Sequence, residues 1–173
     1  LNALTGAKVL AQDRLFSTLD ATTRKLWIGH ERPETTLSDT VGFIRKLPHH
    51  LVASFRSTLK VVADADLVLH LVDASDRWRD EEMRVARDLL DELCGDAVPR
   101  LSVFNKIDAL DKPDRDALSA HFPDAIQVSA ATREGFETLR AAMADRAGAW
   151  RAARTAKADA ELEKAVEELE WLG

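Results

Sequence analysis

The sequence predicts an α/β fold in which helices cover both faces of a mostly parallel sheet. Short apolar segments of strand length alternate with segments whose apolar residues recur at helical spacing. Strands that alternate with helices form parallel sheets, and such sheets bind ligands at the carboxyl ends of their strands. A polar residue stands at the end of each of four strand candidates, which indicates a ligand site at this edge. These residues are Asp39, Asp73, Asn105 and Ser129.

The first half of the chain predicts a β-hairpin and a helix. Residues 25–28 and 34–38 are strand candidates, and the turn-forming residues 29–33 between them favour antiparallel pairing. Apolar residues recur at helical spacing over 51–63. We therefore expect an antiparallel strand pair followed by a helix over 51–63.

The second half predicts regular alternation of strands and helices. The segment 67–72 is nearly all apolar, which is typical of a strand covered on both faces. The expected elements are a strand over 67–72, a helix ending near Gly95, a strand over 101–104, a helix over 114–120, a strand over 125–128 and a helix over 135–144.

The last 26 residues differ from the rest, so we expect a domain over 1–147 and a charged amphipathic helical tail over 148–173. The tail is rich in Ala, Glu, Lys and Arg, with a narrow apolar stripe. Two interpretations stay open. The tail packs on its own domain or extends into solvent, or it is a docking helix for a partner.

The composition excludes some function classes. The formal net charge of −6 argues against a protein that grips nucleic acid by bulk electrostatics. No apolar run approaches the ~20 residues that a membrane-spanning helix needs. Cys94 is the single cysteine, which excludes an intrachain disulfide and fits a cytoplasmic location.

Asn105-Lys106-Ile107-Asp108 matches N-K-x-D, the motif with which GTPases recognise guanine. The carboxylate of Asp108 can accept hydrogen bonds from the ring N1–H and the exocyclic amine of guanine, a pattern that adenine lacks. The stem of Lys106 can lie over the base, and Asn105 can brace the loop and reach the N7 side of the base. Ser129-Ala130 suggests a further loop whose backbone amide meets the guanine O6.

Asp39-Thr40-Val41-Gly42 matches D-x-x-G, the motif that senses magnesium and the γ-phosphate. Asp39 would orient a magnesium-bound water, and the Gly42 amide would meet the γ-phosphate, because glycine lets the backbone approach closely. The two motifs are separated by about the length of chain that a GTPase domain needs.

With these motifs in place, residues 39–55 resemble the switch II segment of the HflX family of translational GTPases, residues 15–24 resemble its switch I, and residues 72–76 match its usual pattern. The resemblance runs from Leu1 to about Ala144. It implies a P-loop GTPase-like three-layer sandwich, GTP or GDP and Mg²⁺ as cofactors, and the large ribosomal subunit as partner.

The resemblance also implies residue roles. Thr18 matches the switch I threonine that would meet magnesium, although Thr22 and Thr23 compete with it. Phe43 stands where many GTPases place a water-orienting glutamine, which implies slow intrinsic turnover that the ribosome would stimulate. His49 and His50 form a histidine pair after proline that is either an exposed helix start or a replacement base.

The sequence departs from the family at its beginning. It contains no G-x-x-x-x-G-K-[ST] phosphate loop, and Leu1-Asn2-Ala3-Leu4 resembles the helix that follows this loop. In the family a strand precedes the loop and lies between the strands of Asp39 and Leu67, and an N-terminal domain precedes both. We therefore expect the first strand to be missing, with unpaired edges and exposed apolar side chains in the middle of the sheet.

Two functions remain open. The chain is the C-terminal part of a ribosome-associated protein that hydrolyses GTP to GDP and phosphate, and is inactive as this isolated polypeptide because it lacks most phosphate-binding groups. Alternatively, it is a non-hydrolysing ribosome- or partner-binding remnant. A start at Leu1 favours a fragment, and the coding sequence upstream of Leu1 would discriminate the two.

Overall fold

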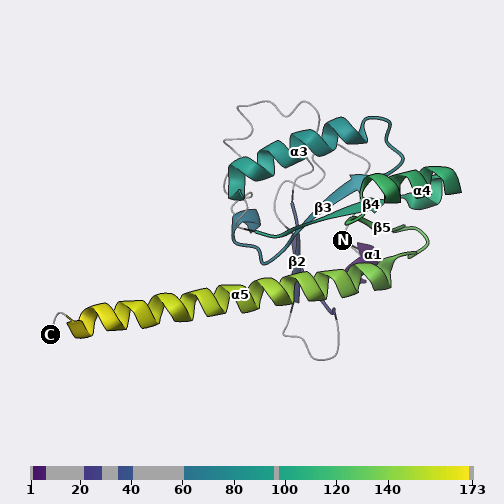
Figure 1. Cartoon of the computed structure of the whole chain (residues 1–173). Coiled ribbons are helices and arrows are strands. Elements are labelled where there is room, and N and C mark those ends of the chain that lie inside the picture. The colour runs from purple at the N-terminus through teal and green to yellow at the C-terminus, as the bar shows by residue number, and fades with distance from the viewer. Residues whose placement is uncertain (1, 7–21, 29–34, 41–60, 96–97, 172–173) are drawn as a thin grey trace.

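The computed structural model describes residues 2–6, 22–28, 35–40, 61–95 and 98–171. Within these ranges the strands form two sheets, an antiparallel pair and a parallel sheet of order β3-β4-β5 (Figure 1). The elements are α1 (Asn2–Thr5), β1 (Thr22–Leu26), β2 (Thr35–Asp39), β3 (Val68–Asp73), α3 (Arg79–Cys94), β4 (Arg100–Asn105), the 3₁₀ helix η1 (Ile107–Ala109), α4 (Lys112–His121), β5 (Ile126–Gln127) and α5 (Phe136–Trp171).

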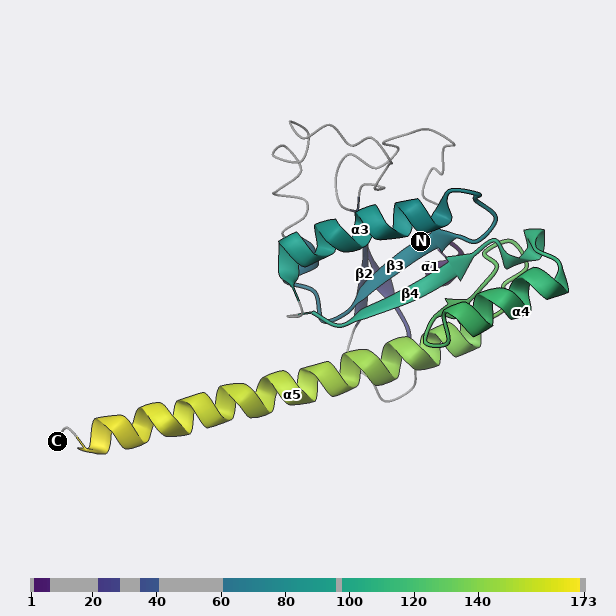
Figure 2. The same cartoon turned by 45° about the horizontal axis from the view of Figure 1, so that its top comes forward.

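The parallel sheet lies in the middle of three layers. Helices α3 and α4 cover one face and α5 covers the other (Figure 2). The alternation of side chains along β4 explains this arrangement, since successive residues of a strand point to opposite faces. Leu101 and Val103 join the cluster that contains Met143 of α5, whereas Phe104 joins the cluster that contains Met83 of α3. The predicted α/β fold class is confirmed.

The antiparallel pair of β1 and β2 is also confirmed, with Thr22 opposite Asp39 and Leu26 opposite Thr35. Strand β1 begins three residues before the predicted 25–28. The β-branched Thr22 and Thr23 suit a strand, and the Thr23 hydroxyl lies 2.7 Å from the Ser38 hydroxyl across the pair. The expected turn at 29–33 lies outside the described residues.

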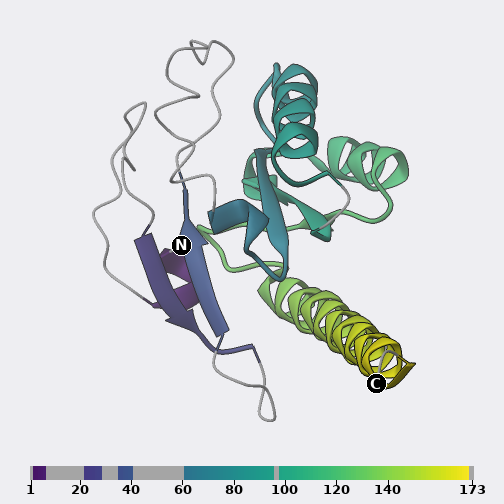
Figure 3. The ribbon, with the colours of Figure 1, turned by 90° about the vertical axis from the view of Figure 1, so that its left-hand side faces the viewer.

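Side-chain packing, not a shared ladder, joins the two sheets. Leu26 of β1 is buried in the same cluster as Leu101 and Val103 of β4. Among the described strands, β2 pairs only with β1 and β3 only with β4 (Figure 3). Within the described ranges, β2 therefore has a ladder partner on one side only, and so does β3.

Strand β3 is less fully covered than the sequence predicts. Val72 is buried beside Phe104, but Leu71 on the opposite face is 62% exposed. The expectation that this strand is covered on both faces is therefore wrong at Leu71. The reason is that β3 is the outer strand of its sheet among the described strands.

Helix α3 is amphipathic and ends where predicted. Its buried residues Met83, Ala86 and Leu90 recur at helical spacing, and Gly95 follows its last residue with φ +52°. Arg100, the first residue of β4, donates hydrogen bonds to the Gly95 carbonyl and, at 2.6 Å, to Asp91. This side chain ties the end of the helix to the start of the next strand.

Helix α5 runs from Phe136 to Trp171 without a break, so the predicted last helix and tail are one element (Figure 1). Arg151 and Arg154 reach Asp66, in the segment before β3, at 2.9 and 3.2 Å. Residues 152–164 are exposed along this chain. The division into a domain and a tail at 147 stays a prediction.

The other expected helix, over 51–63, lies largely outside the described residues, where only 61–63 are seen to be helical. In the ranges that the structure describes, no helix combines the length and apolar character needed to cross a membrane.

Candidate functional site

Three of the four predicted strand-end residues meet at one edge of the parallel sheet. Asp73 and Asn105 end β3 and β4 and lie opposite each other in the ladder. Ser129 follows β5 by two residues, and the Val128 N–H before it bonds to the Phe104 carbonyl at 2.8 Å. Asp39 ends β2 and therefore belongs to the other sheet.

The loop after β4 carries the N-K-x-D motif and is fixed by its apolar residue. Lys106 adopts a left-handed conformation, with φ +65°, which turns the chain from β4 into η1. Ile107 is 3% exposed and packs in the core cluster that contains Met83 of α3, and its N–H bonds to the Val128 carbonyl. Lys106 and Asp108 on either side of it are exposed. The buried isoleucine thus anchors a loop that presents two charged side chains.

The loop after β5 orients these residues through Ser129, which is fully buried. The Ser129 hydroxyl donates a 2.5 Å hydrogen bond to Oδ1 of Asp108 and accepts one from the Thr132 N–H. The Ala130 N–H donates to Oδ1 of Asn105 at 2.9 Å. The two loops therefore form one hydrogen-bonded unit. The sequence suggested a backbone role for this segment and missed the role of the serine hydroxyl.

Asp73 joins this unit through its contact with Lys106. Its Oδ2 lies 2.7 Å from Nζ of Lys106, and its Oδ1 accepts hydrogen bonds from the N–H and the hydroxyl of Ser75. Burial of the Asp73 carboxyl raises its pKa, but the hydrogen bonds from Lys106 and Ser75 outweigh this effect and hold the pKa below its usual value. Asp73 is therefore held as a carboxylate.

The β5 loop closes only because Gly135 has no side chain. Its φ is +77°, and a Cβ there would lie 2.1 Å from the carbonyl oxygen of Gln127. The Ser129 N–H bonds to the Glu134 carbonyl just before this glycine. Gly135 therefore lets the loop fold back onto β5, a requirement that the sequence alone did not reveal.

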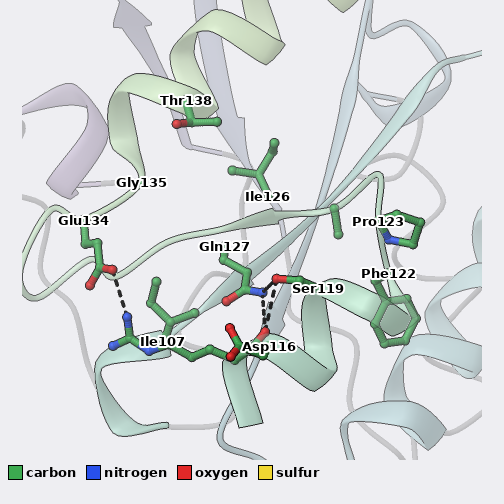
Figure 4. A pocket seen from close by; sticks show the side chains of 12 residues that line it. Ile107, Asp116, Ser119, Phe122, Pro123, Ile126, Gln127, Glu134, Gly135 and Thr138 are labelled. Atoms are coloured by element: carbon green, nitrogen blue, oxygen red, sulfur yellow. Dashed lines mark hydrogen bonds and ion pairs between the residues drawn. The ribbon is translucent and has the colours of Figure 1, made fainter. Parts of the chain in front are cut away.

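A pocket between α4, β5 and the start of α5 lies behind this loop (Figure 4). Arg115 of α4 pairs with Glu134 at 2.8 Å, and Gln127 of β5 donates to the Ser119 hydroxyl at 2.7 Å. The first pair ties the loop to α4, and the second ties β5 to α4.

The predicted phosphate and magnesium residues are mostly outside the described ranges. Thr18, Gly42, Phe43 and the histidine pair all fall there, and of the candidates only Asp39 and the competing Thr22 and Thr23 are placed. Asp39 is exposed at the end of β2. No cluster of three or more His, Cys, Asp or Glu residues that could hold a metal occurs in the described part. The described geometry is therefore mainly that of the two loops after β4 and β5.

Residues 1–106 match the model of a protein family described as 50S ribosome-binding GTPases. This chain belongs to that family. It is 49% identical to GTPase HflX of Gluconacetobacter diazotrophicus over 140 residues, which cover 81% of this chain and 31% of that protein. It is 41% identical to GTPase HflX of Escherichia coli over 147 residues, which cover 84% and 34%. The resemblance to HflX GTPases is thereby confirmed, and the chain spans about a third of these relatives.

A solved structure supports the same fold. The crystal structure of the SsGBP and GDP complex superposes with a TM-score of 0.62 at 26% identity, and the match covers 85% of this chain and 44% of that one. The mixed α/β fold of this GTPase family member is thus shared with a protein whose structure was solved with GDP.

The chemistry of the described loops fits a guanine base. A carboxylate offers about four acceptor positions, and the Ser129 hydroxyl uses one of those on Asp108. The remaining positions are sufficient for two hydrogen bonds from a base edge. Asp108 is exposed, so its carboxylate is accessible to a ligand.

Proposed function

We propose that this family member supplies the guanine-recognition part of a ribosome-associated protein that hydrolyses GTP to GDP and phosphate. The observation that carries the proposal is the orientation of Asp108 by the fully buried Ser129. A carboxylate held in this way accepts from the N1–H and the exocyclic amine of guanine, which adenine cannot donate in that pattern.

The other residues of the two loops complete the proposed base site. The stem of Lys106 covers the base, Asn105 reaches its N7 side, and the backbone amide at Ser129-Ala130 meets its O6. Because the Ala130 N–H donates to Asn105 in this structure, guanine binding requires the Asn105 side chain to yield that donor or share it.

Hydrolysis in such a protein depends on positioning and on magnesium, which neutralises charge on the phosphates, and uses no protein nucleophile. We assign Asp39, Thr18 and Gly42 to this part on the strength of their motifs. The sequence contains no G-x-x-x-x-G-K-[ST], so we propose that this polypeptide by itself hydrolyses no GTP. The large ribosomal subunit is the proposed partner, in line with the family description, and the cytoplasm is the proposed location.

A nucleotide competition assay tests the base specificity. The product of the whole open reading frame that encodes this chain is loaded with a fluorescent GDP analogue, which is then displaced by unlabelled GDP, IDP or ADP. We expect IDP to displace it about tenfold less well than GDP, because IDP lacks the exocyclic amine, and ADP to be weaker still. Equal displacement by GDP and ADP would refute the proposed function.

A further inference from the structure

The ammonium group of Lys106 is paired with a carboxylate in this structure. Its Nζ lies 2.7 Å from Oδ2 of Asp73, although the side chain is 60% exposed. An exposed lysine ordinarily samples many rotamers, and ordering it costs conformational entropy. Contact with Asp73 removes part of that freedom before any ligand arrives.

Asp73 is itself rigidly placed. Ser75 donates to its Oδ1 from both the backbone N–H, at 3.0 Å, and the hydroxyl, at 2.7 Å. The Ala74 N–H bonds to the Asn105 carbonyl at 2.8 Å, which joins the exit of β3 to the exit of β4. The carboxylate is therefore fixed relative to the N-K-x-D loop by the sheet and by the turn that follows β3.

We propose that Asp73 is a positioning residue for guanine-nucleotide binding, which holds the ammonium of Lys106 so that the lysine stem stays over the base site. This inference rests on the proposed function, since it requires that Lys106 covers the base. Asp73 itself touches no nucleotide. Its effect is on the lifetime of the bound nucleotide, because a preordered cover slows the departure of the base.

Two substitutions separate this role from a purely structural one. Asp73→Asn keeps an acceptor oxygen for the Ser75 N–H and removes the charge that pairs with Lys106. Asp73→Glu keeps the charge but lengthens the side chain, so it disturbs the turn at Ser75. If Asp73 acts through Lys106, the asparagine variant is the more harmful; if Asp73 serves only the turn, the glutamate variant is.

The experiment measures the dissociation rate of a fluorescent GDP analogue from the whole gene product. We expect Asp73→Asn to raise the rate about fivefold, a size reduced by the exposure of the pair, and Asp73→Glu to raise it less. Lys106→Met raises the rate as well, and Asp73→Asn adds nothing further in the Lys106→Met background. Asp91→Asn is the matched control, because it removes the similarly short ion pair between Asp91 of α3 and Arg100 of β4. We expect it to leave the rate unchanged.

A separate measurement of base preference distinguishes failure of the role of Asp73 from failure of the proposed function. The wild-type protein is first tested for its preference for GDP over ADP, and the absence of that preference overturns both proposals. With the preference present, an unchanged rate in Asp73→Asn overturns the role of Asp73 alone. So does a full additional effect of Asp73→Asn in the Lys106→Met background, which would show that Asp73 acts independently of the lysine.

Discussion

Single backbone and side-chain positions set the shape of the candidate site, and Gly135 is the strictest of them. The Cβ of Gly135→Ala would overlap the Gln127 carbonyl, and φ +77° is strained for alanine. We expect Gly135→Ala to lower the free energy of unfolding by about 2–4 kcal/mol in urea denaturation. Gly6→Ala is the matched control, since Gly6 has φ +69° but, apart from its chain neighbours, no described residue has an atom within 4 Å of the position that a Cβ would take. Equal losses in the two variants would contradict the overlap.

His70 on β3 makes stability depend on pH. Burial, with the charges of Arg87 and Arg100, lowers its pKa below the ordinary 6.5. Above pH 6.5 the imidazole is neutral in both the folded and the unfolded chain, and its contribution to stability is complete. As the pH falls below 6.5, the unfolded chain takes up the proton first, so stability is lost until the pH passes the folded-state pKa.

The corresponding prediction is a slope of at most about 1.4 kcal/mol per pH unit in the free energy of unfolding just below pH 6.5. His70→Gln abolishes this slope, whereas His121→Gln, on the exposed surface of α4, leaves it in place. Chemical denaturation at a series of pH values measures it. A His70→Gln variant with the wild-type slope would show that another group is responsible.

At the scale of elements, the β1–β2 pair depends on side-chain packing for its attachment to the parallel sheet. Leu26 is 5% exposed and is the residue of this pair that lies fully within the shared core. We expect Leu26→Ala to lower the free energy of unfolding by about 2–4 kcal/mol and to loosen β1 and β2 more than β4. Residue-resolved amide exchange tests this, with the exposed neighbour Lys25→Ala as control. Equal loss of protection in β2 and β4 would mean that the sheets unfold together.

Apolar periodicity predicted the order and type of these elements well. The reason is that a helix or strand with a buried face has apolar residues at the spacing of that element. The apolar segment 101–104 predicted a strand, and the structure has β4 there, with Leu101 and Val103 in one core cluster and Phe104 in the other. Boundaries were less predictable where polar residues carry the strand, as at Thr22 and Thr23. The exposure of Leu71 depends on which strand lies beside β3, which a local pattern does not contain.

The candidate site was likewise only partly predictable from the sequence. Asn105, Lys106 and Asp108 could be predicted because their motif is continuous in sequence. The contacts of Asp73 with Lys106 and of Ser129 with Asp108 could not, since they join residues 33 and 21 positions apart that only the sheet brings together. The polar strand-end position of Asp73 was the available signal.

The whole molecule combines a well-packed half that carries the candidate site with a second sheet attached to it and a long helix, α5, that extends along one face (Figure 3). The three-layer arrangement places the exits of β3, β4 and β5 at one edge, where the two loops meet. We propose that this edge selects guanine through Asp108.

Nucleotide selection by an Asp108→Asn variant of the whole gene product tests this claim most directly. An amide donates a hydrogen bond where guanine also donates, whereas xanthine presents a carbonyl oxygen at that position. We predict that the variant loses about tenfold or more in affinity for GDP and gains affinity for xanthosine diphosphate, measured by competition against the wild-type protein. An unchanged affinity for GDP in a folded Asp108→Asn protein would contradict the assignment of Asp108.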